Sequence, residues 1–281
     1  MKVTVIGASG FIGRHLVAAL RARNDEVTTA SLREPAEAAQ ACTGADAIVN
    51  LAGESVAQRW TPQVKEKIRS SRVDAARRLF GQLAAREAKP ASYVSASAIG
   101  YYGTSDGATF TEASPPGNDF LAEVCAAWEA EADRAAELGM RVAKVRTGVV
   151  LGTDGGALAK LLPVFRLGAG GIIGSGRQWY SWIHIEDLVG IYLLALDGAA
   201  GALNGTAPNP VSNADFTRAL GKAVHRPTIV PVPKPALELM LGEAASVILE
   251  GQRVLPERTL ESGYHFRYET LDAALAQLLK E

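Results

Sequence analysis

The sequence predicts an α/β protein of the Rossmann type, with a doubly wound parallel sheet and a smaller C-terminal lobe. A glycine-rich turn joins an N-terminal apolar run directly to a stretch of helical periodicity. Four further apolar runs of strand length then alternate with helical stretches, a pattern typical of parallel sheets. The 281 residues are enough for one large sheet domain with a smaller lobe attached.

The N-terminal stretch predicts a strand, a tight turn and a helix in direct succession. Residues 3–6 form a short apolar run, and Gly-Ala-Ser-Gly-Phe-Ile-Gly at 7–13 opens the helix. Gly7 permits the turn, Gly10 lets the backbone approach a pyrophosphate, and Gly13 lets the helix pack closely on the strand. An ordinary glycine-containing turn is the alternative, but the position between strand and helix favours a dinucleotide site. We expect the cofactor to contact Gly7, Ser9, Gly10, Phe11, Ile12 and Gly13.

Composition and charge argue against several classes of partner. The formal net charge of −1 provides no basic field for nucleic acid or anionic lipid, and no apolar stretch has the length of a membrane span. Cys42 and Cys125 are far apart, and the four histidines form no metal-binding array. No signal-peptide pattern follows Met1. We therefore expect a cytoplasmic protein with a small-molecule partner, without metal, nucleic acid or membrane; the oligomeric state stays open.

The end of the second predicted strand indicates which cofactor is bound. This strand, residues 27–30, ends about twenty residues past the glycine turn, where such folds read the adenosine ribose. An NAD(H) site uses a carboxylate there, whereas Ser31 and Arg33 suit a 2′-phosphate. Glu34 follows directly and argues the other way, and a solvated loop arginine is the alternative for Arg33. We predict NADP(H), bound through Ser31 and Arg33.

Later strand ends supply the other expected cofactor contacts. After the strand at 47–49, the turn Asn50-Leu-Ala-Gly-Glu54 has small residues that allow a dinucleotide to lie against the backbone. Arg72 opens a helix and can reach a phosphate, although such an arginine is more often a solvated helix end. The strands at 93–96 and 142–145 lead to the nicotinamide side of the cleft. The expected contacts are Leu51, Ala52, Gly53, Glu54, Arg72, Ser95 and Val150.

Hydroxyl and imidazole groups are expected where nicotinamide and substrate meet. The carboxyl ends of parallel strands line the ligand crevice, and Ser97, Tyr101 and Tyr102 follow the fourth strand. His184 belongs to the polar and aromatic segment 177–188, which suits a ligand wall. We expect Ser97 to orient a carbonyl group and Tyr101, Tyr102 or His184 to exchange the proton. The alternative is that the serine only ends the strand and that the rings are core residues.

A change of pattern after Gly152 marks the expected domain boundary. Residues 1–152 are predicted to form the Rossmann domain, to which 177–206 return. Residues 153–176 and 207–281 are predicted to form the C-terminal substrate lobe. Within this lobe we expect a helix broken at Pro163 and a mobile glycine-rich loop at 168–176, with a flexible linker as the alternative for the loop.

Motifs spread over nearly the whole chain carry a family resemblance. In addition to residues 7–13 and 50–54, they are Ser95-Ala-Ser-Ala-Ile-Gly-Tyr-Tyr-Gly103, Arg146-Thr-Gly-Val-Val-Leu-Gly152, Gly174-Ser-Gly-Arg-Gln178, Ser181-Trp-Ile-His-Ile185 and Ala207-Pro-Asn-Pro210. With these motifs the chain resembles the epimerase-like family of atypical extended short-chain dehydrogenases/reductases, often labelled sugar-nucleotide epimerase or cell-division inhibitor. The resemblance implies NADP(H), a C-terminal lobe that completes a substrate cleft, and a small substrate that the family leaves open, with a nucleotide-sugar-like molecule as one candidate.

The resemblance also identifies a missing catalytic pair. Extended members carry Tyr-x-x-x-Lys, in which the lysine lowers the pKa of the tyrosine so that the phenol can exchange a proton. Matching through Trp128-Glu129 puts Leu121 and Cys125 at these two positions, and neither can do this chemistry. The epimerase-like family as a whole lacks the pair. Two hypotheses remain: an NADP(H)-dependent oxidoreductase or epimerase whose proton donor has moved, and a non-catalytic NADP(H)-binding protein that regulates a partner.

Overall fold

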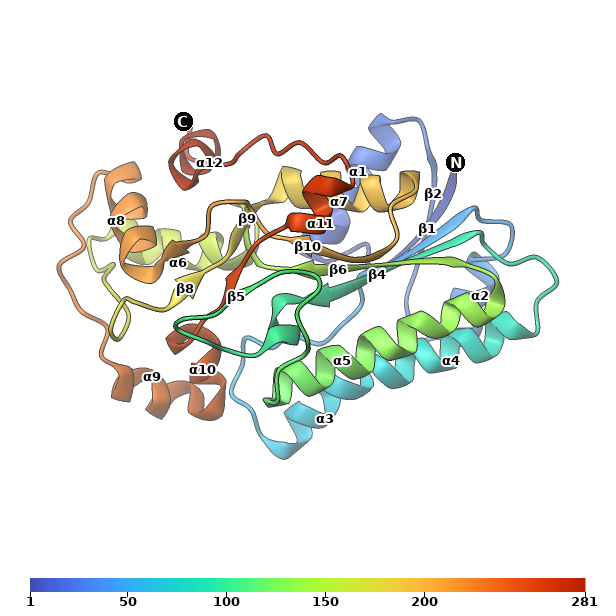
Figure 1. Cartoon of the computed structure of the whole chain (residues 1–281), viewed down its shortest axis with the longest axis horizontal. Coiled ribbons are helices and arrows are strands. Elements are labelled where there is room, and N and C mark those ends of the chain that lie inside the picture. Colours follow the sequence, from blue (N-terminus) through green and yellow to red (C-terminus); the bar gives the residue numbers. More distant parts are fainter. Residues whose placement is uncertain (281) are drawn as a thin grey trace.

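A parallel sheet of six strands forms the centre of the protein, in the order β10-β6-β4-β3-β1-β2 (Figure 1). The computed structural model describes residues 1–280. The strands are β1 (Lys2–Ile6), β2 (Glu26–Ala30), β3 (Ala47–Asn50), β4 (Ser92–Ala98), β6 (Arg141–Thr147) and β10 (Gly201–Gly205). The chain runs from β1 outward to β2 and then crosses to the other side of β1, so the strand order reverses between β1 and β3. The predicted doubly wound parallel sheet is confirmed, and ligands of such sheets bind at this switch point.

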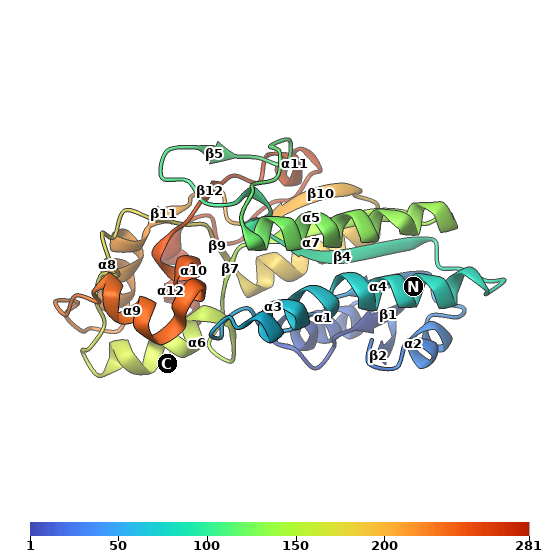
Figure 2. The same cartoon turned by 90° about the horizontal axis from the view of Figure 1, so that it is seen from below.

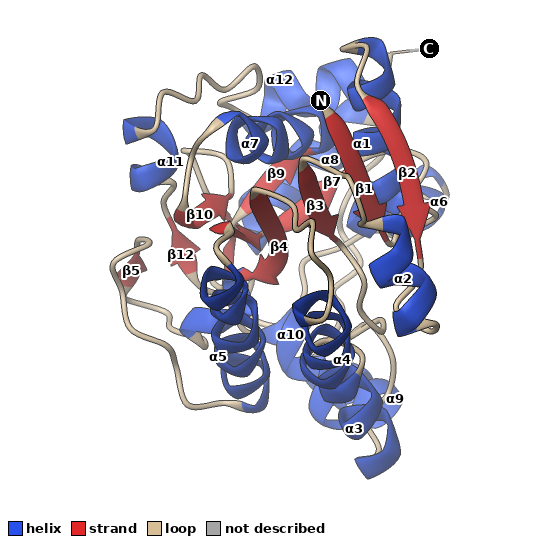
Figure 3. Cartoon of the chain, turned by 90° about the vertical axis from the view of Figure 1, so that its right-hand side faces the viewer, coloured by secondary structure: helices blue, strands red, loops and turns tan. Residues whose placement is uncertain are grey.

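Helices cover both faces of the sheet (Figure 3). One face carries α1 (Phe11–Ala22) and α7 (Ile185–Asp197), which contact each other. The other face carries α2 (Pro35–Ala41), α4 (Val73–Ala84) and α5 (Phe120–Asp133), with α3 (Pro62–Ser70) leading into α4. Each face has its own buried apolar cluster, and burial of these side chains supplies the main driving force for the fold.

Many elements from later in the chain gather at one end of the molecule, on the left in Figures 1 and 2, whereas the short helix at 257–261 packs against β10 of the central sheet. A third apolar cluster that includes Trp182, Phe216 and Leu275 holds many of them together. The shorter strands are β5 (Thr109–Phe110), β7 (Val149–Leu151), β8 (Trp179–Tyr180), β9 (Trp182–His184), β11 (Val211–Ser212) and β12 (Arg253–Val254). The helices are α6 (Gly156–Arg166), α8 (Asn213–Ala223), α9 (Lys234–Leu241), α10 (Ser246–Leu249), α11 (Glu257–Glu261) and α12 (Leu271–Leu278). Short 3₁₀ turns cover Ile99–Tyr102, Arg134–Leu138 and Gly242–Ala245.

The predicted break at Pro163 is wrong. Helix α6 continues through Pro163 to Arg166, although a proline removes one helical hydrogen bond and crowds the preceding turn. Leu158, Leu162 and Phe165 of the same helix are buried in the third apolar cluster, and this burial outweighs the local cost.

The glycine-rich segment 168–176 is tied to α8 at two points. The Ile173 N–H donates to the Asn213 side chain at 3.0 Å, and the Ala214 N–H donates to the Gly176 carbonyl at 2.9 Å. These bonds fix where the segment lies, and its mobility stays a prediction.

Candidate cofactor and substrate site

The glycine turn lies at the switch point between β1 and β3. Gly7 has a φ of +83°, which L side chains rarely adopt, and a Cβ there would meet the backbone of Leu51 and Ala52 at 3.0 Å. A Cβ on Gly13 would clash with the Gly7 carbonyl oxygen, so this glycine lets α1 pack against the turn. At Gly10 a Cβ would have only that oxygen nearby, at 3.3 Å. Packing therefore requires Gly7 and Gly13, whereas Gly10 keeps open the space in front of α1.

The start of α1 offers unpaired backbone donors to an anion. Gly10 is the N-cap residue, no side chain caps the helix, and its first turn contains no carboxylate. Ser9 is exposed beside this helix start, and Ile12 packs against the first apolar cluster. The ring of Phe11 lies so close to Gly152, Gly155 and Gly156 that a Cβ on any of them would touch it. Phe11 therefore anchors the turn to the segment that follows β7.

A first cavity of about 580 Å³ opens between the glycine turn and the end of β2. Its size and position fit the adenosine half of a dinucleotide. Ser31 lines it, while Arg33 is exposed next to it and donates its backbone N–H to Ser31 Oγ at 3.3 Å. Glu34 and Glu37 also line it and place carboxylates in the same wall. The lining residues are Gly7, Ala8, Ser9, Thr29, Ala30, Ser31, Leu32, Glu34, Glu37, Ala38, Ala41 and Ala52.

A second cavity of about 320 Å³ opens at the carboxyl ends of β4 and β6. Ala98 and Thr147, the last residues of these strands, line it, and Ser246 and Gln252 close it from the C-terminal region. Most of its other walls are aromatic or aliphatic. They include Val56, Trp60, Ile68, Phe120, Leu121, Val124, Trp128, Val149, Trp179 and Tyr180.

The segment after β3 lies between the two cavities. Ala52 belongs to the wall of the first, and Leu51 packs on the apolar core. The guanidinium of Arg72 lies over Gly53, where a Cβ would approach Arg72 Cζ to 2.9 Å. Glu54 is exposed and donates its backbone N–H to Ser71 Oγ at 2.9 Å. Arg72 lines the second cavity and not the first, and its contact with a cofactor phosphate stays a prediction.

Ser95 and Val150 line neither cavity. The Ser95 hydroxyl is buried and donates to the Ala96 carbonyl at 2.9 Å, so its own strand satisfies it. Val150 packs against the first apolar cluster. The neighbouring residues Ala98 and Val149 line the second cavity instead.

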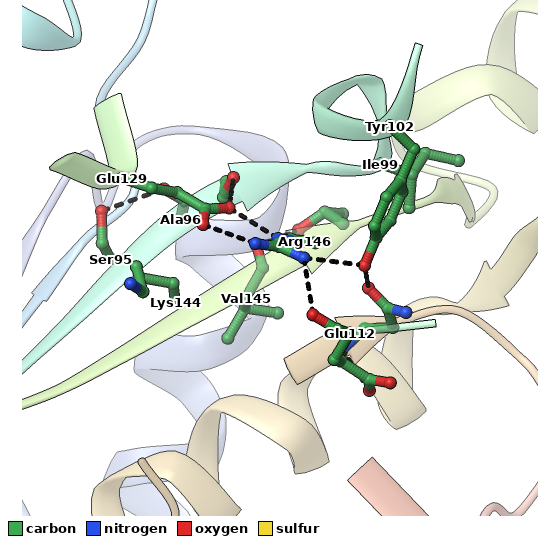
Figure 4. A network of polar contacts seen from close by, with 12 residues as sticks. Ser95, Ala96, Ile99, Tyr102, Glu112, Glu129, Lys144, Val145 and Arg146 are labelled. Carbon is green, nitrogen blue, oxygen red and sulfur yellow. Dashed lines mark hydrogen bonds and ion pairs between the residues drawn. The ribbon is translucent and has the colours of Figure 1, made fainter. Parts of the chain in front are cut away.

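Ser97 and Tyr102 belong to a buried polar network around Arg146 and Glu129, of which Figure 4 shows Tyr102, Glu129 and Arg146. Ser97 donates to Glu129 Oε1 at 2.7 Å, and the same carboxylate accepts two bonds from Arg146 at 2.8 Å. Tyr102 accepts from Arg146 Nη1 at 2.9 Å and donates to Asn204 at 2.6 Å. Burial raises the pKa of Tyr102 to about 12, although Arg146 acts in the opposite direction. Both hydroxyls are engaged in this network, and neither residue lines the second cavity.

Tyr101 and His184 also do not line the second cavity. The ring of Tyr101 faces the guanidinium of Arg146 at 3.5 Å. His184 is buried and caps α7, because its Nδ1 accepts the Glu186 N–H at 3.1 Å while its Nε2 contacts Gln277 at 2.8 Å. Burial lowers the pKa of His184. The structure thus gathers Ser97, Tyr101 and Tyr102 around the Arg146–Glu129 pair, leaves His184 at the start of α7, and places none of the four in the lining of the second cavity.

The two positions matched to the missing pair, Leu121 and Cys125, do line the second cavity. Burial raises the pKa of the Cys125 thiol to about 12, although the Arg72 charge nearby acts the other way. The thiol is therefore protonated at neutral pH and a poor nucleophile. An apolar side chain and an inert thiol stand on this wall of the cavity.

Trp60, Phe120 and Trp128 of the second cavity are residues that the sequence did not indicate, whereas Trp179 and Tyr180 belong to the segment 177–188 that was expected to form a ligand wall. Trp60, Trp128 and Trp179 stand on three different segments, and only the fold brings them to one space. Phe120, Val124 and Trp128 are spaced four residues apart on α5, a pattern typical of core residues, and all three line this cavity. No local motif signals such a wall.

The described part of the chain shows neither a metal site nor a membrane-spanning helix. Residues 1–280 contain no group of three or more His, Cys, Asp or Glu side chains placed to hold a metal ion. In the same range no helix has the length and apolar character needed to cross a bilayer.

The fold and the glycine turn define a Rossmann-type α/β protein, and comparison with known proteins gives the family. Residues 3–207 match the NAD dependent epimerase/dehydratase family, and residues 232–278 match a domain of unknown function, DUF1731. The chain belongs to the NAD dependent epimerase/dehydratase family. This confirms the resemblance drawn from the motifs.

Relatives cover nearly the full length of the chain. It is similar to the chloroplastic epimerase family protein SDR39U1 homolog of Arabidopsis thaliana, with 43% identity over 303 residues, 100% of this chain and 87% of the relative. The human epimerase family protein SDR39U1 is 39% identical over 294 residues, 99% of this chain and 100% of the relative.

Solved structures support the same fold. The crystal structure of human SDR39U1 (isoform 2) with NADPH superposes with a TM-score of 0.92 and 37% identity, covering 99% of both chains. A UDP-glucose 4-epimerase of Thermotoga maritima, solved with UDP-glucose, has a TM-score of 0.81 at 17% identity and covers 99% of this chain and 97% of its own, which shows likeness of fold alone.

Proposed function

We propose that the protein binds NADP(H) across the switch point and acts as an oxidoreductase or epimerase on a small molecule held in the second cavity. The observation that carries this proposal is the placement of two cavities on either side of the glycine turn and the segment after β3. The adenosine half would occupy the first cavity, and the nicotinamide would extend toward Ala98 and Thr147 at the second. The NADPH found in the human relative supports the choice of cofactor.

Different groups of residues would bind different parts of the cofactor. The free N–H groups at the start of α1 would hold the pyrophosphate, and Ser31 with Arg33 would hold the 2′-phosphate. NADP(H) supplies the hydride when it is bound. Residues 207–281 would complete the substrate cavity, because Ser246 and Gln252 line it. We place the protein in the cytoplasm, where its two buried free cysteines stay reduced.

A non-catalytic role remains the second candidate, and one observation favours it. The hydroxyls of Ser97 and Tyr102 and both ring nitrogens of His184 are occupied by protein partners. A protein of this kind would bind NADP(H) and signal its occupancy to a partner. Net oxidation of NADPH on addition of a carbonyl compound would identify an oxidoreductase, and interconversion of epimers without net oxidation would identify an epimerase; a binding protein does neither. If Tyr101 or Tyr102 is the proton donor, its replacement by Phe should reduce the rate of that reaction by about a hundredfold or more.

The experiment that tests cofactor binding uses Gly10→Val. The added side chain would fill the space in front of α1 with little effect on packing, since only the Gly7 carbonyl lies near. We expect one cooperative thermal transition that no longer shifts upward with NADPH, whereas the parent shifts. Gly107→Val is the matched control, because no atom lies within 4 Å of the added Cβ in that loop, and it should shift like the parent. A full shift in Gly10→Val would contradict the assignment.

A further inference from the structure

The second cavity combines apolar walls with few charges. Three charged residues line it, namely Arg72, Asp119 and Glu250. Asp119 caps α5 by accepting the Ala122 N–H at 2.9 Å, and Glu250 accepts the Thr104 hydroxyl at 2.9 Å. Both carboxylates are therefore engaged with donors of the protein. Arg72 is the single lysine or arginine in the lining.

Arg72 has no carboxylate partner within residues 1–280. Its Nη1 donates to the Ile68 carbonyl at 3.0 Å, and its guanidinium stacks over the Trp128 ring at 5.0 Å. Burial lowers the pKa of Arg72, which means that solvent compensates its charge incompletely. A guanidinium stays protonated under such conditions, so the remaining donors of Arg72 are available to an anion.

A second unused donor belongs to Trp128, whose ring contacts Arg72. The Trp128 indole Nε1 is buried and has no hydrogen-bond partner in the described part of the chain. Buried donors of this kind are nearly always paired in native proteins. Arg72 and Trp128 are in contact and both line the cavity, so an anion bound by Arg72 would lie against the tryptophan ring.

We propose that the second cavity takes a compact apolar or aromatic monoanion, such as a small aromatic carboxylate, with Arg72 binding the acidic group and the tryptophan and phenylalanine rings enclosing the apolar body. This proposal rests on the proposed function and specifies the class of substrate for it. Arg72 is an anchoring residue in this assignment and serves the substrate instead of a cofactor phosphate.

The same features argue against a nucleotide sugar in this cavity. A nucleoside diphosphate carries two phosphates and several sugar hydroxyls, which need more cations and more polar partners than one arginine provides. The walls around Trp60, Phe120 and Leu121 would leave those hydroxyls without hydrogen bonds, which is costly. A compact anion with one acidic group avoids both costs.

The test compares the binding affinity of an acid with that of its primary amide, in protein saturated with NADPH. Benzoate, phenylacetate and indoleacetate are each compared with the matching primary amide by calorimetry and ligand-observed NMR. In the parent protein at least one acid should bind about ten- to a hundredfold more tightly than its amide, and UDP-glucose should not displace it. Arg72→Gln, which keeps a donor for the Ile68 carbonyl, should reduce that preference to about twofold or less. Arg72→Lys should retain part of it.

The control variant is Arg69→Met, which removes an exposed arginine one turn earlier and should keep the full preference. Equal binding of acid and amide in all three pairs would overturn the proposal, as would a preference that survives Arg72→Gln. Displacement by UDP-glucose would overturn it in favour of a nucleotide sugar. Loss of NADPH affinity in Arg72→Gln would assign Arg72 to the cofactor instead. Failure of the parent to bind NADPH would refute the proposed function itself and is detected separately by calorimetry without an acid.

Discussion

Arg146 and Glu129 form a two-pronged ion pair inside the protein, with Nε donating to Oε1 and Nη2 to Oε2, each at 2.8 Å. Both side chains are almost fully buried. Burial alone would lower the pKa of Arg146, but the Glu129 carboxylate outweighs it, so the pKa is raised. The pair joins β6 to α5 and, through Ser97 and Tyr102, holds the ends of two central strands in place.

Glu129→Gln should strongly destabilise the protein. It leaves the Arg146 charge buried without its counter-ion, which costs about 3–5 kcal/mol in the free energy of unfolding. Denaturant unfolding measures this difference. Asp133→Asn, which breaks the more exposed pair with Lys144, is the control and should cost about 1 kcal/mol or less. Equal losses in the free energy of unfolding would show that the buried pair stabilises the protein no more than the exposed pair does.

Arg33→Ala should reduce NADPH affinity by about ten- to a hundredfold and leave NADH affinity nearly unchanged, because an arginine–phosphate contact contributes roughly 1.5–3 kcal/mol. Calorimetric titration with both cofactors measures the two changes. Glu34→Gln, which removes a carboxylate from the wall of the first cavity, should change NADPH affinity in the opposite direction. Equal losses for both cofactors in Arg33→Ala would refute the 2′-phosphate assignment.

His184 should make stability depend on pH below neutrality. Its pKa in the folded protein is lowered by burial, although Glu186 and Asp187 act the other way. The histidine of the unfolded chain has a pKa of about 6.5 and therefore binds the proton at a higher pH than His184 of the folded protein does. The free energy of unfolding consequently falls as the pH drops below this value, by at most about 1.4 kcal/mol per pH unit.

Unfolding titrations from pH 7.5 down to about 5.5 check this slope against the linkage relation. His184→Asn keeps a side chain able to cap α7 but cannot take the proton, so it should flatten the slope while costing stability at the upper end. His265→Asn, at an exposed position, should behave like the parent. An unchanged slope in His184→Asn would exclude this histidine as the source.

Cys125 should resist alkylation in the folded protein. Burial raises the pKa values of Cys125 and Cys42 to about 12, so little thiolate exists at neutral or mildly alkaline pH. Mass spectrometry after treatment with iodoacetamide should find both thiols unmodified until denaturant is added. Cys125→Ala should keep NADPH affinity within a few-fold of the parent. Rapid labelling of Cys125 in the native state would refute this account of the cavity wall.

The glycine turn could be predicted from the sequence because its requirements are local. A positive φ at Gly7 and the close contact of Gly13 with the Gly7 carbonyl depend on residues only a few positions apart. The fold class followed from the alternation of strand and helix patterns. The division into residues 1–152 with 177–206, and 153–176 with 207–281, stays a prediction.

The substrate side could not be predicted in the same way. Ser95 and Ser97 share one face of β4 because side chains alternate along a strand, and that face meets the buried network instead of the cavity. Nothing local in the sequence indicates which face of a central strand reaches the cavity. Trp60, Trp128 and Trp179 meet only through contacts between distant segments.

The pairing of β10 with β6 has a consequence for synthesis of the chain. Strand β10, at Gly201–Gly205, is the last to join the sheet and covers an edge of β6 that was made about sixty residues earlier. Until that stretch emerges from the ribosome, β6 presents unpaired backbone groups along its length, a template for pairing with a neighbouring nascent chain. A chain terminated at Gly152 would keep this edge permanently open. Chaperone occupancy on translating ribosomes should therefore persist past residue 205 and decline only afterwards.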